Sequence, residues 1–435
     1  MLHELVLEGR IVNPEWIEEA QLGIDGGKIT ELSKQGLRGE QQVDTRGCYI
    51  FPGFVDPHVH LREDGSHLWA YKEDFASGTA AALHGGVTTV VDMPNTPEPG
   101  ITAERIREKK ELARAQSRGA IDILFCAGVT PRTVDTLAAL RPEVVAYKLY
   151  LVDTGGLYLD PESLPAALRA VAATAQPAIV HAEDHALLTQ RSAQESASAG
   201  ARSRSSLDYA ALRPPEAEIV AVERVLAAAA SVPHLSLSIA HVSVHESIAH
   251  IKRFANVHCE VTPHHLFFSR DDALQRPGFL KTNPPVRTED NRQRLLASFK
   301  AGAIDFLASD HAPHTSEEKA RDLLDAPAGV PHLDTYGNFV AWLLVNCGVH
   351  PTLIARACAY RPARFLGLRD RGRIEVGARA DLAILDLQQT VRISRERLYT
   401  RCGWSPFEGY EFPGTVKHTI SNGAVMSDYD EVLLF

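Results

Sequence analysis

Two histidines that lie two positions apart, His58 and His60, are the residues of this chain best suited to metal chemistry. They belong to the run Phe54-Val-Asp-Pro-His-Val-His-Leu-Arg62, which is typical of a buried strand. Successive side chains of a strand alternate between its two faces, so both imidazoles project in the same direction. Two neutral imidazoles side by side form half of a metal site, although an isolated pair more often has no ligand role.

Four further polar residues also stand late in, or directly after, short apolar runs: Lys148, His181, His241 and Asp310. Imidazole and carboxylate groups are the ligands of divalent ions of the zinc type, and the set is large enough for two ions. Any one of these residues could be a satisfied polar residue of a strand. Six of them at equivalent positions indicate a shared ligand.

Lys148 differs from the other five because an ammonium group would be repelled by two dications. It must therefore lose its charge, pair with a carboxylate, or react with carbon dioxide to give a carbamate. A carbamate is an anion whose two oxygens can bridge two metal ions. Such a pair of ions would bind a hydroxide between them and make a nucleophile at neutral pH.

The middle of the chain alternates apolar runs with helical patterns, which predicts βα units and a parallel sheet. Eight candidate strands begin near Phe54, Thr88, Ile121, Val144, Ala178, Leu235, Val257 and Ala303. Helical patterns cover residues 102–118, 161–175, 214–230, 244–255 and 291–301. Eight strands with right-handed crossovers predict a (β/α)8 barrel of the TIM type, whose active site lies at the carboxyl ends of the strands. The six polar residues above would meet there.

Both ends of the chain are rich in short β-type runs separated by glycine and Asn-Gly turns. We predict that residues 1–52 and 369–435 together form a small β-sandwich domain and that residues 53–368 form the barrel. Residues 192–206 are polar and are predicted to be a surface loop.

Charge and composition exclude several classes of function. The chain has 45 basic and 55 acidic residues, a net charge of −10 without a basic block, so nucleic acid is not an expected partner. An anionic substrate would need a local cation. The six cysteines form no regular framework, and no apolar run approaches the ~18 residues of a membrane span. With no secretory pattern at the N-terminus, we expect a cytoplasmic enzyme.

The combination of these motifs resembles the amidohydrolase superfamily and, within it, the dihydroorotases, over about residues 2–425. The matching segments are His58-Val-His60-Leu-Arg62, Met93-Pro-Asn95-Thr, Lys148-Leu-Tyr-Leu, Thr262-Pro-His-His-Leu and Ala308-Ser-Asp310-His-Ala-Pro-His314-Thr. The resemblance implies two zinc ions per chain, bridged by N6-carboxylysine at Lys148 and by a hydroxide. Their ligands would be His58, His60, Lys148, His181, His241 and Asp310.

The resemblance also implies the reaction, the reversible cyclisation of N-carbamoyl-L-aspartate to (S)-dihydroorotate and water in pyrimidine synthesis. Asp310 would carry the proton between the hydroxide and the ring nitrogen. Arg62 could clamp the substrate carboxylate in a bidentate manner, which suits a guanidinium better than an ammonium. The family pattern assigns Arg62, Asn95 and His314 to that carboxylate, and more weakly assigns Asn283 and Thr154 to the substrate. Without the resemblance to this family, the sequence would favour a turn residue at Asn95 rather than a ligand-binding one. A homodimer or higher homo-oligomer is expected because barrel relatives often pair.

Three departures from the family pattern bear on substrate choice more than on metal chemistry. The proline that usually follows His-Leu-Arg-Glu in the family is replaced here. The loop over residues 63–72 is also about three residues longer than in the family pattern, and loops of this type carry substrate specificity. His332 and Asp334 stand where glycine and glutamate are usual. The alternatives are another cyclic amidohydrolase, an allantoinase or hydantoinase (dihydropyrimidinase), and a catalytically silent relative that serves as a partner subunit.

Overall fold

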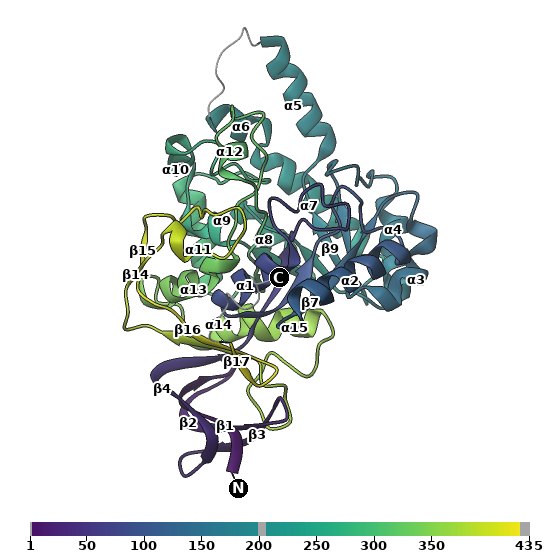
Figure 1. Ribbon diagram of the computed structural model, residues 1–435. Helices are drawn as coiled ribbons and strands as arrows, with labels where there is room; N and C mark the ends of the chain where they lie inside the picture. The colour runs from purple at the N-terminus through teal and green to yellow at the C-terminus, as the bar shows by residue number, and fades with distance from the viewer. Residues whose placement is uncertain (1, 199–205, 427–435) are drawn as a thin grey trace.

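The structure is a computed structural model that describes residues 2–198 and 206–426. Its centre is a parallel sheet of eight strands in the order β12-β11-β10-β9-β8-β7-β6-β5, surrounded by helices (Figure 1). The strands are β5 (Phe54–Val59), β6 (Val87–Asp92), β7 (Asp122–Val129), β8 (Ala146–Tyr150), β9 (Ala178–His181), β10 (Leu237–Ile239), β11 (Val257–Val261) and β12 (Phe306–Leu307). Each predicted strand is present and begins close to its predicted residue. The (β/α)8 prediction is therefore confirmed.

The sheet closes into a barrel just beyond its first and last strands. Val59 forms a parallel bridge with His311, and the backbone N–H of His60 donates to the carbonyl of His311 at 2.8 Å. The carboxylate of Asp56 accepts hydrogen bonds from the backbone N–H groups of Ser309, at 3.1 Å, and His58, at 3.2 Å. Closure therefore joins two parts of the chain that are about 250 residues apart in sequence.

Helices cover the outside of the barrel at the places where the helical periodicity predicts them. The five predicted helices are α2 (Ala103–Ser117), α4 (Leu164–Thr174), α7 (Pro215–Ala229), α8 (His245–Ile251) and α11 (Glu289–Lys300). The others are α1 (Phe75–His84), α3 (Leu137–Leu140), α5 (His185–Ser198), α6 (Ser206–Leu212), α9 (Pro263–Phe267), α10 (Arg270–Gln275), α12 (Ser316–Lys319), α13 (Tyr336–Val345), α14 (Pro351–Ala355) and α15 (Arg361–Phe365). In the described ranges, no helix is long and apolar enough to cross a membrane.

The prediction of a surface loop over residues 192–206 is wrong for residues 192–198. Helix α5 continues through Ser198 and projects from the top of the molecule in Figure 1. Its sequence contains alanine and glutamine but neither glycine nor proline, so a polar composition does not interrupt the helix. Residues 199–205 lie outside the described part of the chain.

Both ends of the chain build one seven-stranded sheet, the terminal sheet, in the order β17-β16-β13-β4-β1-β2-β3. Its strands are β1 (Leu2–Val12), β2 (Ile17–Asp25), β3 (Lys28–Ser33), β4 (Arg38–Pro52), β13 (Leu382–Asp386), β16 (Thr415–Ser421) and β17 (Ala424–Met426). A further pair, β14 (Val391–Arg392) and β15 (Glu411–Phe412), forms a separate ribbon. A β-rich unit drawn from both termini is thus confirmed, whereas the exact domain boundaries stay a prediction.

Strand β4 passes into the first barrel strand through a single glycine, Gly53. The Gly53 N–H donates to the carbonyl of Asp381 at 2.7 Å, which ties the barrel entrance to the terminal sheet. A Cβ atom on Gly53 would stand 2.3 Å from Oγ1 of Thr88 in β6. Only glycine therefore fits where the junction of β4 and β5 passes β6. This junction lies at the amino end of β5, whereas the polar residues of interest follow the carboxyl ends of the strands.

We predict that Gly53→Ala lowers the free energy of unfolding by about 1–3 kcal/mol, the usual cost of overpacking. Gly100→Ala is the matched control because its added Cβ would meet no atom closer than 3.5 Å. The double variant Gly53→Ala/Thr88→Ala should recover part of the loss, since it removes the crowded hydroxyl. Urea denaturation followed by circular dichroism measures all three, and equal stabilities of the two single variants would contradict the close approach.

Candidate active site

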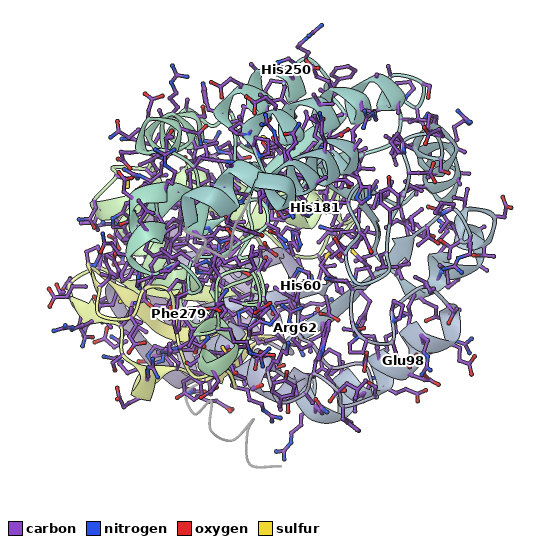
Figure 2. The ribbon with its side chains drawn as sticks, turned by 90° about the horizontal axis from the view of Figure 1, so that it is seen from above. His60, Arg62, Glu98, His181, His250 and Phe279 are labelled. Atoms are coloured by element: carbon purple, nitrogen blue, oxygen red, sulfur yellow. The ribbon has the colours of Figure 1, made fainter. Side chains whose placement is uncertain are left out.

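The six residues predicted to bind metal all lie at the carboxyl end of the barrel. His58 lies in β5 and His60 just after it, Lys148 lies in β8, and His181 ends β9. His241 and Asp310 follow β10 and β12. Seen from above, His60, Arg62 and His181 lie toward the middle of the molecule, whereas His250 and Glu98 lie at its periphery (Figure 2).

The four histidine rings are neighbours, and the Asp310 carboxylate lies beside two of them. The ring centroids of His58 and His60 are 5.3 Å apart, those of His58 and His241 5.4 Å, and those of His181 and His241 4.6 Å. Oδ1 of Asp310 lies 3.2 Å from Nε2 of His60 and 3.4 Å from Nε2 of His58. Ligand atoms of His58, His60 and Asp310 all fall within 4.8 Å of one another, as in a metal-binding group.

Lys148 is fully buried directly behind this cluster. Its Nζ lies 3.2 Å from Nε2 of His58. Burial lowers the pKa of Lys148, although the nearby Glu260 and Asp310 carboxylates favour its charged form. A buried amine that gives up its proton more readily is better able to react as a nucleophile.

Three histidines each contact a carboxylate or amide oxygen through one ring nitrogen, and in His58 and His60 the other nitrogen, Nε2, faces Lys148 or Asp310 of the same cluster. Nδ1 of His58 lies 2.8 Å from the carboxylate of Glu260, and Nδ1 of His60 lies 2.9 Å from Oδ1 of Asn95. Nε2 of His181 lies 2.8 Å from the carboxylate of Glu183. Each acceptor holds the ring proton on its own side, so the opposite nitrogen carries a lone pair, as in carboxylate–histidine–metal arrangements.

The protonation states fit the same use. Burial, aided by Lys148, lowers the pKa of His58 to about 3, and burial holds the pKa of His241 well below its usual value. Both imidazoles are therefore neutral at pH 7, the form that binds a metal. Nδ1 of His241 is buried and has no hydrogen-bond partner among the described residues. The residues present thus fit a divalent ion.

Three site residues adopt a backbone conformation that is rare outside glycine. Arg62, His241 and Asp310 have φ angles of 64°, 38° and 46°. Each stands where a strand has just ended, so a left-handed turn redirects its side chain toward the mouth of the barrel. Such strain is held by the surrounding structure and is concentrated at functional sites.

A small cavity of about 100 Å³, the site pocket, opens above these residues. It is lined by nine of the eleven residues proposed from the sequence: His58, His60, Arg62, Asn95, Thr154, His181, His241, Asn283 and Asp310. The other two do not line it, because Lys148 lies behind His58 and His314 lies behind Arg62. The remaining lining residues are Tyr150, Thr282, Ala312, Ala328 and Gly329.

Arg62 is the principal cation at the wall of the site pocket. Its Nε donates to the carbonyl of Pro313 at 3.2 Å, and its Nη2 lies 3.1 Å from Nε2 of His314. Arg62 is only 5% exposed, yet no ion pair neutralises it within the described residues. A buried charge without a partner is costly, so this guanidinium is suited to an anionic ligand.

Asn95, Asn283 and Thr154 contribute polar groups around the pocket. Oδ1 of Asn95 accepts from the Tyr150 hydroxyl at 3.0 Å and faces Nδ1 of His60, which leaves its amide nitrogen as the group available to a ligand. The Thr154 hydroxyl donates to the carbonyl of Val152 at 3.1 Å, and Oδ1 of Asn283 accepts from the hydroxyl of Tyr209. All three residues line the site pocket.

Glu260, Glu183 and Tyr150 are the supporting residues that sequence reasoning missed. Glu260 contacts His58 across 202 positions, a pairing that no local pattern could reveal. Burial raises the pKa of Glu183, but the nearby Arg213 and His181 outweigh this effect and hold that pKa below its usual range. The Glu183 carboxylate therefore stays charged. Tyr150 could have been found, because it stands two residues after Lys148 on the same strand.

The unusual residues His332 and Asp334 do not line the site pocket. His332 stacks on His264 with an interplanar angle of 10°, and Asp334 accepts hydrogen bonds from the backbone of Tyr399 and Thr400 at 2.8 and 2.9 Å. Both are buried in the packing behind the site. These two departures therefore do not alter the pocket wall directly.

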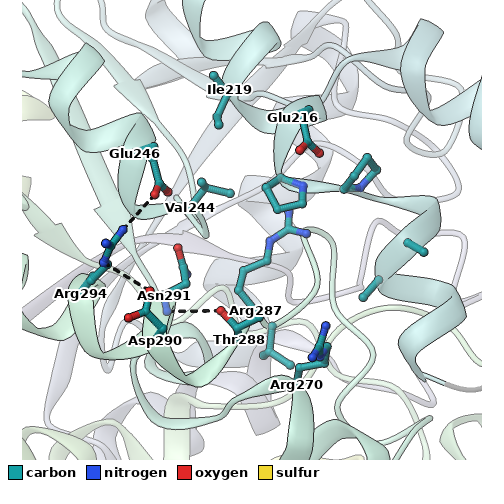
Figure 3. A pocket seen from close by; sticks show the side chains of 15 residues that line it. Glu216, Ile219, Val244, Glu246, Arg270, Arg287, Thr288, Asp290, Asn291 and Arg294 are labelled. Carbon is teal, nitrogen blue, oxygen red and sulfur yellow. Dashed lines mark hydrogen bonds and ion pairs between the residues drawn. The ribbon is translucent and has the colours of Figure 1, made fainter.

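A larger cavity, about 620 Å³, lies among α6, α7, α8 and α11 (Figure 3). Three of its six charged residues pair with one another, since Arg294 lies 3.1 Å from Glu246 and 3.3 Å from Asp290. It holds none of the histidines of the barrel mouth. The smaller site pocket is therefore the candidate active site.

Comparisons with known proteins agree with this geometry. A profile of the Amidohydrolase family matches residues 49–426. The chain is 36% identical to a dihydroorotase of Methanothermobacter thermautotrophicus, over 94% of this chain and 91% of that protein. It is 35% identical to a dihydroorotase of Pyrococcus abyssi, over 99% and 96%. Among solved structures, an L-hydantoinase (dihydropyrimidinase) from Arthrobacter aurescens superposes with a TM-score of 0.92 at 26% identity, covering 98% of this chain and 96% of that one.

We predict that Glu260→Gln weakens the binding of a divalent ion, with zinc as the probe, by about 10- to 100-fold, because His58 loses the carboxylate that orients its ring. Glu218→Gln is the matched control, since Glu218 is an equally buried glutamate that accepts from the backbone N–H of Ser243 at 3.0 Å, outside the site. Competition with a chromophoric chelator measures the affinity. Equal zinc affinity in both variants would show that Glu260 does not support the site.

Proposed function

The chain belongs to the amidohydrolase family and is a hydrolase of cyclic amides, and we propose that its substrate is dihydroorotate. The reaction would be the reversible hydrolysis of (S)-dihydroorotate to N-carbamoyl-L-aspartate, a step of pyrimidine synthesis. Support comes from several relatives named dihydroorotase, at 30–36% identity over nearly the whole chain.

The observation that carries the proposal is the unneutralised guanidinium of Arg62. It is buried at the wall of the site pocket, and the described residues give it no carboxylate partner. Dihydroorotate is a cyclic amide that carries a carboxylate, which would supply the missing charge through two parallel hydrogen bonds. A neutral ring would leave the charge unpaired, at a considerable cost in a buried site.

Asn95 also lines the pocket wall, and His314 lies behind Arg62. The amide nitrogen of Asn95 is free to donate, and Nε2 of His314 lies 3.1 Å from Nη2 of Arg62. The donors of Arg62 and Asn95, which we propose His314 joins from behind Arg62, would hold a carboxylate in one orientation and place the ring amide toward Asp310 and the histidines. Positioning of this kind supplies a large share of a catalysed rate.

We propose that His58, His60, His181, His241, Asp310 and Lys148 hold two zinc ions, with Lys148 carried as N6-carboxylysine. When bound, these ions would polarise the ring carbonyl and lower the pKa of a water molecule. The neutral imidazoles and their fixed ring protons fit this use.

Asp310 is the residue proposed to move the proton. Its Oδ1 lies beside His58 and His60 at the floor of the site pocket, where the attacked amide would lie. In hydrolysis the carboxylate would take a proton from the attacking water and deliver it to the ring nitrogen as the C–N bond breaks. In the reverse direction the same carboxylate would take the proton from that nitrogen while the ring closes and water leaves.

A second candidate is the hydrolysis of a neutral ring such as a hydantoin. The structural likeness to an L-hydantoinase favours it. The charge of Arg62 argues against it, because neither hydantoin nor dihydrouracil carries a carboxylate. A silent partner subunit is disfavoured because all six proposed ligand residues are present and adjacent.

We expect the zinc-loaded protein to hydrolyse dihydroorotate in preference to hydantoin, allantoin and dihydrouracil when the four are assayed in parallel. Arg62→Met should raise KM for dihydroorotate roughly 100-fold, the worth of a hydrogen-bonded charge pair. The variant should therefore lose the preference for the carboxylated ring. Hydrolysis of allantoin or hydantoin alone by the wild-type protein would overturn the substrate assignment.

Asp310→Asn should retain zinc but lower kcat by about 10²- to 10⁴-fold, because an amide cannot accept the proton. Asp305→Asn is the matched control in the same segment, since Asp305 pairs with Lys252 at 2.6 Å away from the site pocket. Zinc content is measured by atomic absorption and turnover by the absorbance of dihydroorotate. Undiminished turnover in the Asp310 variant would rule out this proton path.

A further inference from the structure

The segment between β9 and α7 leaves the barrel and returns with an arginine at its end. It contains α5, which projects from the molecule, and the short helix α6 (Figure 1). Arg213 follows α6 directly and precedes the two prolines at which α7 begins. Its backbone carbonyl accepts a hydrogen bond from Nη1 of Arg287 at 2.6 Å. The chain therefore returns to the barrel at a fixed point.

The guanidinium of Arg213 holds the carboxylate of Glu183 through two hydrogen bonds. Nε donates to Oε1 at 3.0 Å, and Nη2 donates to Oε2. The side chain of Glu183 is 0% exposed and that of Arg213 is 15% exposed, so the pair is shielded from water. Two parallel hydrogen bonds fix the plane of a carboxylate, which a single contact with an ammonium group does not do.

The same carboxylate contacts His181, one of the histidines at the site pocket. Oε2 of Glu183 lies 2.8 Å from Nε2 of His181, and His181 lines the pocket. A carboxylate can only accept a hydrogen bond, so Nε2 carries the ring proton and points at Oε2. The plane of the carboxylate thus sets the rotation of the imidazole ring. Arg213 does not line the pocket, and its contact with the site runs through Glu183.

We infer that Arg213 is a positioning residue for the metal site: through Glu183 it fixes the ring orientation of His181. The inference rests on the proposed role of His181 as a metal ligand and deepens it, because it gives the segment between β9 and α7 a part in metal binding. Among the described residues, Glu183 has side-chain contacts with Arg213 and His181 alone. Without the guanidinium, the carboxylate would be held by His181 only and its plane would no longer be fixed.

The alternative is that the ion pair only fastens this segment to the barrel, and a neighbouring pair allows the two roles to be separated. Arg224 of α7 pairs with Asp184, the residue directly after Glu183. The side chain of Asp184 is buried, with 3% exposed, and neither residue of this pair lines the site pocket. Arg224→Met is therefore the matched control for Arg213→Met, since both remove a guanidinium from a buried carboxylate.

The test measures zinc affinity by competition with a chromophoric chelator, in the absence of substrate. Arg213→Met should weaken zinc binding roughly 10- to 100-fold, the range for residues that support a metal ligand from behind. Arg224→Met should leave zinc affinity unchanged. Wild-type affinity in Arg213→Met overturns the inference, and so does an equal loss in both variants, which would indicate a general effect of removing an ion pair.

A double-mutant cycle tests the route through Glu183. Glu183→Gln should weaken zinc binding to a similar extent, because the amide cannot hold both Arg213 and His181 as the carboxylate does. Arg213→Met/Glu183→Gln should then bind zinc no more weakly than Glu183→Gln alone, since two losses along one path do not add. Losses that multiply in the double variant would mean that Arg213 acts by another route, and they overturn the inference.

Two further outcomes keep the test decisive. If Arg213→Met fails to fold because Glu183 is left buried without a cation, Arg213→Lys takes its place. This variant keeps the charge but not the two parallel hydrogen bonds, so its zinc affinity should fall at least about threefold. An unchanged affinity in Arg213→Lys overturns the inference.

Failure of the proposed function can be told apart from failure of this inference. If the wild-type protein hydrolyses hydantoin but not dihydroorotate, the substrate assignment fails, and the zinc measurements still decide the role of Arg213. If the wild-type protein binds no divalent ion under zinc-replete conditions, the proposed metal site fails and the inference fails with it. If the wild-type protein and Arg213→Met bind zinc equally, the inference alone fails.

Discussion

The closure of the barrel between β5 and the segment after β12 is the constraint on which the site depends. His58 and His60 come from the first strand, and Asp310 comes from a turn about 250 residues later. The bridge between Val59 and His311 and the hydrogen bonds of the Asp56 carboxylate hold these two parts together. No other strand pair could bring the proposed proton carrier to the His58–His60 pair, because strand order in the barrel fixes which ends are neighbours.

The site pocket divides into two chemically different sides. Its floor consists of neutral imidazoles, three of which contact a carboxylate or amide behind them, and suits a dication. Its wall consists of donors, Arg62 and the groups around it, and suits an anion. The chain as a whole carries a net charge of −10, so the attraction for an anionic substrate is local rather than general. Substrate choice and bond cleavage are thus assigned to different residues only a few ångströms apart.

Much of the fold and most of the site can be predicted from the sequence, because both depend on local patterns. The alternation of apolar runs gives the eight strands, and the position of His181 at the end of its run already places it at the barrel mouth. What cannot be predicted depends on contacts between distant segments. Glu260 meets His58 across 202 positions, and Lys72 meets His314 across 242. His332 and Asp334 look relevant to the substrate in sequence, yet they pack behind the site, since spacing alone does not show which way a loop residue faces.

The terminal sheet has a consequence for how the chain folds during synthesis. Strand β4 pairs with β1 on one side and with β13 on the other, so its second edge stays unpaired until residues near Leu382 leave the ribosome. At about 5–20 residues per second, that delay is on the order of tens of seconds. Until then, the part of the edge that β13 later covers, residues 49–52, can pair with another chain, so the nascent protein passes through a period of exposure to aggregation that its native state does not reveal.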